Sequence, residues 1–281
     1  MLVYGRELDI VNFGDGTTRD ALARDTETCV CVLPPAAFKD WGTVVARFEA
    51  AELIVKRVRT LYLDGNTASD VGRVCGVEGR PLEGAVSLLC IMGGLDGVRK
   101  MQSLCAAAAG ELGIAAPLVA TTAAEAADLV SICSPAPSTA TLDSCTCCVV
   151  KPHAIKTGAL GAILDGVIQQ GYEVSAMDTF QFDKAQADEF LEVYKDVVPQ
   201  YADHVVQLCS GLCVGMELRA ENAVETFRQT VGPWDVEMAK ELRPATLRAK
   251  HAVDNVRCGV HCTDLPTDGP VECEYLFKIL S

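Results

Sequence analysis

The chain has 281 residues, of which 49% are hydrophobic and 22% are charged, a composition typical of a folded globular protein. The net charge of -14 opposes adhesion to nucleic-acid phosphates and to anionic lipid, so neither a nucleic acid nor a membrane is expected as a partner. No apolar run reaches the ~18 residues of a transmembrane helix, and the first residues lack the features of a secretory signal.

The first half of the chain resembles the second half in three segments. The matching pairs keep their order along the chain: residues 28–36 with 146–154, 42–45 with 161–164, and 84–89 with 211–216. Their offset of roughly 120 to 130 residues indicates a duplicated domain and not a short solenoid repeat. The last third of the first copy, residues 105–127, is rich in alanine and predicts a helix.

Residues 134–144 (SPAPSTATLDS) read as a linker, because they contain two prolines and small polar residues. Hydrophobic periodicity then predicts seven elements in the second copy. These are a strand at 145–151, a helix at 160–167, a strand at 172–182, a helix at 184–198, a strand at 211–218, a helix at 220–231 and a strand at 274–280.

This order of elements predicts a split βαβ, ferredoxin-like arrangement, in which helices pack on one face of an antiparallel sheet. We therefore predict an α+β protein with two such domains in tandem. The expected boundaries are an N-terminal extension (1–23), a first domain (24–133), the linker (134–144) and a second domain (145–281).

The fourteen cysteines are expected to be reduced thiols, because no secretory signal precedes them. Two groups could be drawn as zinc ligands, the run 145–148 and the set Cys258, His261 and Cys262. Zinc sites usually pair two such knuckles on turns, whereas Cys145 begins a predicted strand. We therefore interpret these cysteines as small apolar core residues.

Four segments of the second copy carry a family resemblance. They are residues 147–154 (CCVVKPHA), 192–195 (EVYK), 242–248 (LRPATLR) and 260–266 (VHCTDLP). Over its whole length this copy resembles a nucleoside diphosphate kinase domain, and is closest to the second kinase domain of the two-domain, cilium-associated branch. Residues 5–15 resemble the end of the DM10 module that precedes the kinase domains in that branch.

The resemblance implies a ping-pong reaction in which a nucleoside triphosphate phosphorylates a histidine and a nucleoside diphosphate then collects the phosphoryl group. His261 matches the family's nucleophile, and Glu272 matches the carboxylate that holds the other ring nitrogen. Thr263 takes the place of a serine whose hydroxyl lies near the transferred phosphoryl group and the leaving oxygen.

Lys151, Arg228 and Arg248 match the family's three phosphate-binding cations, and Mg²⁺ is expected to bind through the nucleotide phosphates. The chain has no GxxxxGK[ST] motif, so a P-loop mechanism is not expected.

The second copy also departs from the family pattern at four positions. Cys258 replaces a nucleotide-contacting asparagine, and Trp234 replaces a phosphate-binding threonine. Leu191 stands where a tyrosine that supports the histidine is expected. The aromatic residue that stacks on the base is Tyr201 or, without a shift in the alignment, the position is Gln200.

The first copy is predicted to be inactive, because all four histidines lie in the second half and Leu33 occupies the lysine position. Two functions remain in competition. One is a nucleoside diphosphate kinase with a single working site. The other is a structural scaffold of the ciliary or flagellar axoneme that contacts tubulin or neighbouring microtubule proteins. A nucleotide-binding regulatory module is a third, weaker interpretation. The expected location is the cytoplasm and the axoneme, and the expected state is a monomer.

Overall fold

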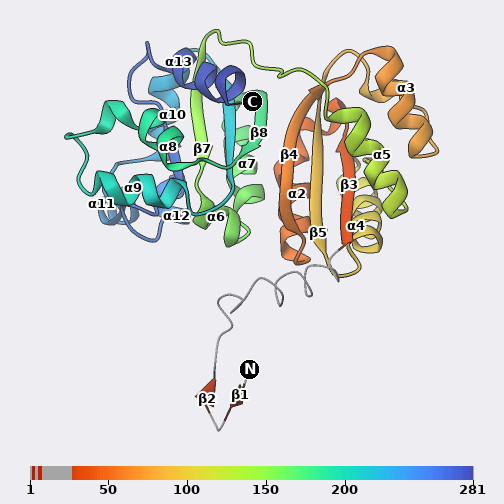
Figure 1. The fold of residues 1–281 in the computed structure, drawn as a ribbon, viewed down its shortest axis with the longest axis horizontal. Helices are drawn as coiled ribbons and strands as arrows, with labels where there is room; N and C mark the ends of the chain where they lie inside the picture. Colours follow the sequence, from red (N-terminus) through yellow and green to blue (C-terminus); the bar gives the residue numbers. More distant parts are fainter. Residues whose placement is uncertain (1, 4–5, 8–26, 281) are drawn as a thin grey trace.

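The computed structural model describes residues 2–3, 6–7 and 27–280. Near the start of the chain, β1 (Leu2–Val3) and β2 (Arg6–Glu7) form a short antiparallel pair. The rest of the segment predicted to resemble a DM10 module lies outside the described residues. Residues 27–133, the N-terminal unit, and residues 145–280, the C-terminal unit, each build a four-stranded antiparallel sheet (Figure 1).

The N-terminal unit has the strand order β4-β5-β3-β6. Its elements are β3 (Glu27–Leu33), η1 (Pro35–Asp40), α2 (Trp41–Ala50), β4 (Ile54–Tyr62), α3 (Gly65–Val74), η2 (Arg80–Leu82), β5 (Val86–Gly94), α4 (Gly97–Leu112), β6 (Leu118–Val119) and α5 (Ala123–Cys133).

The C-terminal unit has the order β10-β7-β9-β8, which is the same arrangement of first, second, third and fourth strands. The predicted pair of ferredoxin-like folds is thus confirmed. Its elements are β7 (Cys145–Val150), α6 (Pro152–Lys156), α7 (Leu160–Gln169), β8 (Glu173–Phe180), α8 (Lys184–Phe190), η3 (Glu192–Tyr194), α9 (Tyr201–Leu208), β9 (Cys213–Arg219), α10 (Ala223–Val231), α11 (Val236–Leu242), α12 (Leu247–His251), β10 (Val260–Cys262), α13 (Gly269–Glu274) and the π-helical turn η4 (Tyr275–Ile279).

Each sheet is covered on both faces. In the C-terminal unit, α7 and α10 pack on one face, as predicted, while α8, α9 and α13 build a second core on the other. In the N-terminal unit, α2 and α4 share the first of these cores and α3 and α5 cover the opposite face. Helices α2 and α4 of the N-terminal unit and helices α7 and α10 of the C-terminal unit therefore meet in one core between the two sheets. Among the described helices, none has the length and apolar character that spanning a bilayer requires.

Helices α2 and α7 cross closely because each carries a glycine at the crossing. A Cβ on Gly42 would overlap the backbone of Asp165, and a Cβ on Gly161 would overlap the backbone of Ala46. The two contacts are mutual, so the units are related by an approximate twofold axis. Glu49 extends the contact by accepting hydrogen bonds from the first backbone N–H groups of α7.

The edge strands β4 and β8 lie side by side and are joined mostly through side chains (Figure 1). Arg57 donates two hydrogen bonds to the buried carboxylate of Asp178, at 2.9 and 2.8 Å. The hydroxyl of Thr179 bonds both backbone groups of Val58, and the hydroxyl of Thr60 does the same with Met177 across the junction. These hydrogen bonds give partners to the backbone N–H and C=O groups of Val58 and Met177 at the edges of the two strands.

Several predicted boundaries in the C-terminal unit are wrong. The helix predicted at 184–198 ends at Phe190, after which the chain turns through Asp196 and Gln200, both with positive φ. The strand predicted at 274–280 is helical, since its buried residues Leu276 and Phe277 continue the helical spacing of Cys273, which precedes it. The fourth strand is instead β10.

The N-terminal unit also differs from the prediction. The alanine-rich segment 105–127 is not one helix, because α4 ends at Gly113 in the left-handed conformation and β6 intervenes before α5. Pro34 precedes the first helical residue after β3 as Lys151 does after β7, so Pro34, and not Leu33, occupies the lysine position. Proline, like leucine, is uncharged, so this unit still has no cation at the lysine position.

Candidate active site

His261 is the central residue of β10 and pairs with Val149 of β7. Its Nε2 lies 3.0 Å from Oε2 of Glu272 in α13, and both side chains are buried. The carboxylate can only accept a hydrogen bond, so this contact places the proton on Nε2 and leaves the lone pair on Nδ1. The arrangement prepares Nδ1 to act as a nucleophile.

Glu272 is itself held by two hydroxyl groups. Thr263 donates to its Oε2 at 2.8 Å and accepts from the backbone N–H of Cys147 at 3.0 Å. Tyr194 donates to Oε1 at 3.5 Å. Thr263 is fully buried, so its hydroxyl supports the carboxylate and does not face the cleft, unlike the expected position near the phosphoryl group.

Tyr194 is the site residue that the sequence analysis missed. Its ring centroid lies 5.7 Å from that of His261, in an edge-on orientation. The ring centroid of Phe190 lies 5.1 Å from that of the same imidazole. Burial, with Glu272 nearby, raises the pKa of Tyr194, so it remains a hydrogen-bond donor. Leu191 therefore does not mark a lost tyrosine. The segment 192–195 already contained this signal, three residues further along the chain.

Lys151 follows β7 directly and is buried. Its Nζ donates to the backbone carbonyl of Val256 at 3.0 Å and lies 3.4 Å from Nδ1 of His204 in α9. Burial and the charge of Lys151 lower the pKa of His204 to about 4, so this second imidazole is neutral and accepts from the ammonium group.

Arg248 is buried beside Trp234. Its Nη1 donates to the carbonyl of Gly232 at 2.9 Å, its Cζ lies 5.2 Å from the centre of the indole ring, and its Nε has no hydrogen-bond partner. The indole also approaches His204, with 5.4 Å between ring centroids. Trp234 is thus held by a cation and an imidazole that both line the candidate site.

Trp234 separates two spaces. The inner one is lined by His261, Lys151 and Arg248 and has a volume of about 20 Å³, room for roughly one water molecule. The outer groove, lined by Arg228 and Arg248, measures about 480 Å³. Lys151 and Arg248 therefore share a cavity with the nucleophile candidate, whereas Arg228 lies in the outer groove.

Arg228 is half-exposed and ion-paired with Asp264, with Nε 3.2 Å from Oδ1. Tyr201 lines the inner cavity, and its hydroxyl is fixed to Asp188 at 2.9 Å. Gln200 begins α9 with a positive φ and is not among the cavity-lining residues.

Cys258 is buried in the wall of the inner cavity. Burial alone would raise the pKa of this thiol, but the charges of Lys151 and Arg248 outweigh that effect and lower it. A thiol whose pKa is lowered therefore stands where the resemblance implies an asparagine.

The N-terminal unit has no counterpart of this site. Strand pairing places Leu118 opposite Val32 as His261 lies opposite Val149, so Leu118 occupies the histidine position. With Pro34 at the lysine position, the unit has neither nucleophile nor cation there.

Comparison with known proteins gives a consistent picture. Residues 144–280 match the family model described as nucleoside diphosphate kinase. The chain is 33% identical over 319 residues to Nucleoside diphosphate kinase homolog 7 of Mus musculus, with 99% of this chain and 78% of that protein covered. It is 34% identical over 133 residues to the nucleoside diphosphate kinase of Aquifex aeolicus, which covers 47% of this chain and 93% of that protein. A crystal structure of the Aquifex aeolicus nucleoside diphosphate kinase covers 48% of this chain and 95% of its own, with 33% identity and a TM-score of 0.46.

Proposed function

Because this chain belongs to the nucleoside diphosphate kinase family, we propose that its C-terminal unit transfers a γ-phosphoryl group between nucleotides through phosphorylated His261. The observation that carries the proposal is the hydrogen-bonded set of His261, Glu272 and Thr263, with Lys151 and Arg248 lining the same cavity. The N-terminal unit contributes packing and no chemistry.

In the first half-reaction, Nδ1 of His261 attacks the γ-phosphorus of a nucleoside triphosphate, and the bond to the bridging oxygen of the diphosphate breaks. Glu272 stabilises the positive charge that develops on the ring, because its carboxylate accepts a hydrogen bond from Nε2–H, with 3.0 Å between the two heavy atoms. In the second half-reaction, a terminal oxygen of another diphosphate attacks the phosphohistidine and restores the neutral imidazole.

The cations supply most of the stabilisation of the transferred group. Lys151 and Arg248 would contact its oxygens, and the Nε of Arg248, which lacks a partner, is one available donor. Binding requires that Trp234 leave its place between Arg248 and His204, which would join the inner cavity to the outer groove. Arg228 would then reach the same phosphate chain.

The residues present fit a magnesium ion that the nucleotide carries. The outer groove offers arginines and two carboxylates, Glu225 and Asp264, of which Asp264 is already paired with Arg228. When bound through phosphate oxygens, Mg²⁺ would neutralise part of their charge and orient them.

The test is to incubate the full chain with γ-labelled ATP and Mg²⁺ and to look for an acid-labile phosphoenzyme. The wild type and His251→Gln should be labelled, whereas His261→Gln should not. His251 is the matched control because it lies in the same unit but does not line the inner cavity. An unlabelled wild type, or labelled His261→Gln, contradicts the proposal.

A second candidate function is a structural protein of the axoneme that contacts microtubules. The closed position of Trp234 and the N-terminal unit without a histidine favour it. The internal contacts of α2 with α7 and of β4 with β8 support a monomeric block for this role. Retention of the tagged chain in demembranated axonemes would support the second function, and a diffuse cytoplasmic signal that washes out would oppose it.

A further inference from the structure

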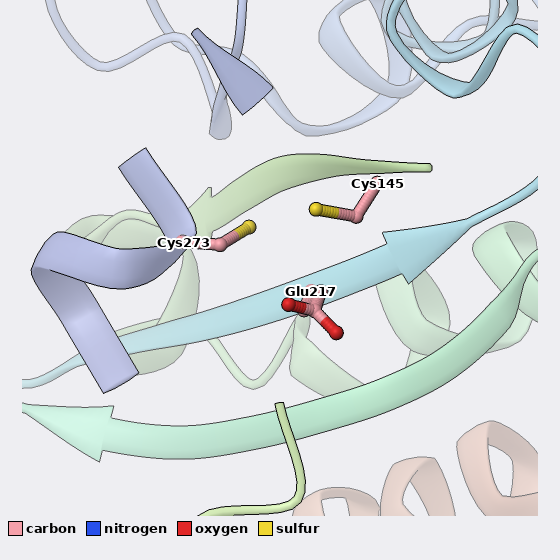
Figure 2. Close-up of side chains that lie close together, drawn as sticks. All are labelled: Cys145, Glu217 and Cys273. Carbon is pink, nitrogen blue, oxygen red and sulfur yellow. The ribbon is translucent and has the colours of Figure 1, made fainter. Parts of the chain in front are cut away.

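Three side chains that can bind metals converge in the C-terminal unit, away from the cleft. Cys145 begins β7, Glu217 lies in β9 and Cys273 lies in α13, and their sulfur and oxygen atoms lie within 4.8 Å of one another. All three residues are buried. Figure 2 shows the two sulfur atoms pointing toward each other beside the carboxylate. We call these residues the Cys145–Glu217–Cys273 cluster.

The carboxylate of the cluster is fixed by four donors. Oε1 of Glu217 accepts from the backbone N–H and the hydroxyl of Thr141 and from the hydroxyl of Ser175, at 2.6 to 2.9 Å. Oε2 accepts from the backbone N–H of Leu142 at 2.9 Å, which leaves it a free lone pair. Carboxylates that ligate metals are oriented by hydrogen bonds of this kind.

A further thiol, that of Cys147, belongs to the same core but lies outside the group of ligand atoms that meet within 4.8 Å. Two sulfurs and one carboxylate oxygen, from β7, α13 and β9, give three of the four donors that a tetrahedral ion needs.

We propose that the Cys145–Glu217–Cys273 cluster binds one Zn²⁺ ion through its two thiolates and its carboxylate oxygen. Each ligating thiol releases its proton to solvent as the zinc–sulfur bond forms, and no oxidation takes place. Thiolate donors favour zinc over the hard ions Mg²⁺ and Ca²⁺. The ion joins β7, β9 and α13, so its role is to stabilise the C-terminal unit.

The N-terminal unit provides an internal comparison. Cys31 pairs with Cys90 across β3 and β5, and Cys105 of α4 lies in the same core, so this unit also has three buried thiols. Among the described residues of this unit, no three potential ligand atoms lie within 4.8 Å of one another. The close approach of three ligand atoms therefore distinguishes the C-terminal cluster from thiols that only fill a core.

The experiment measures zinc on the full chain, without reference to kinase activity. The purified protein is stripped with a chelator under reducing conditions, dialysed against Zn²⁺ and then against buffer, and its metal content is determined by elemental analysis. We expect one zinc per chain in the wild type and in Cys90→Ser, and less than a fifth of that in Cys145→Ser and Cys273→Ser. Zinc should raise the Tm of the wild type but not of these two variants.

A measurement on the wild type removes any dependence on variants that fold poorly. Co²⁺ in place of Zn²⁺ should give intense thiolate-to-cobalt charge-transfer absorption together with the visible bands of a tetrahedral ion. Wild-type protein that binds no zinc, that keeps its zinc in Cys145→Ser and Cys273→Ser, or whose cobalt form lacks the charge-transfer bands overturns the proposal.

Discussion

The two units share one frame, yet only one carries a candidate site. Both have the same strand order and the same glycine at the helix crossing. They differ in what lies between the frame's elements. Between the helix that follows the third strand and the fourth strand, the N-terminal unit has only residues 113–117, whereas the C-terminal unit has residues 232–259, which contain α11 and α12.

This longer excursion delivers Trp234, Arg248 and Cys258, and the segment after β8 delivers Tyr194 and His204. The fold that both units share positions only two parts of the site. These are β10, which holds His261, and Lys151, which follows the first strand. The N-terminal unit lacks these longer segments and has Leu118 and Pro34 at the positions of the histidine and the lysine. These differences account for the absence of a candidate site in that unit.

Lys151→Ala removes the cation that the N-terminal unit also lacks, and has the largest expected effect. The rate of phosphoenzyme formation should fall by about 10²–10³, because a positive charge near the transferred group is lost. Lys156→Ala is the matched control, since Lys156 bonds the carbonyl of Ser210 and does not line the inner cavity. Rapid-quench labelling measures both, and equal rates in the two variants would contradict the role given to Lys151.

Gly161→Ala tests whether the units are packed as one body. The added methyl group would overlap the backbone at Ala46 and force α2 and α7 apart, at a cost of about 3 kcal/mol. Gly110→Ala is the control, because its Cβ meets nothing within 4 Å and alanine favours a helix. Urea denaturation followed by circular dichroism should show a lower midpoint for the first variant only.

Trp234→Thr tests the closed cavity. Without the indole, the inner cavity should join the outer groove and phosphoenzyme formation should rise by about tenfold, since the barrier of moving the ring away from Arg248 disappears. Trp234→Phe keeps an aromatic ring there and should remain slow. A rate for Trp234→Thr at or below that of the wild type would show that the indole contributes to binding.

Acid should destabilise the C-terminal unit, which holds all four histidines of the chain. The pKa of His204 is lowered to about 4 by burial and by Lys151, so between that pH and about 6.5 the unfolded chain binds more protons. Stability is therefore full above pH 6.5 and falls by up to about 1.4 kcal/mol per pH unit below it. His204→Gln should flatten this dependence in thermal unfolding. An unchanged slope would show that the group titrates normally.

Much of the frame could be predicted from sequence, because the repeated segments and their periodicity are local signals. The family resemblance likewise implied the hydrogen bond between His261 and Glu272 that the structure shows. Tyr194 was missed because α8 ends at Phe190 and the short turn Glu192–Tyr194 follows it, so the tyrosine reaches His261 from three residues beyond Leu191. The helical C-terminal segment was read as a strand from its β-forming residues, although its buried positions have helical spacing.

Other features depend on contacts that no local pattern contains. The position of Trp234 depends on Arg248 and His204, which come from α12 and α9. Cys273 meets Cys145 only after the fold brings α13 to β7. The direction in which Thr263 points also required the structure, because its hydroxyl bonds Glu272 and the backbone of Cys147 behind the imidazole.

The orientation of one imidazole decides the enzymatic account, and the site of phosphorylation on that ring reports it most directly. The wild-type protein is phosphorylated with ATP and examined by ³¹P and ¹⁵N NMR without acid treatment. Because Glu272 holds Nε2, the phosphoryl group should be attached to Nδ1 of His261. Attachment to Nε2, or a phosphoryl group on another residue, would contradict the account.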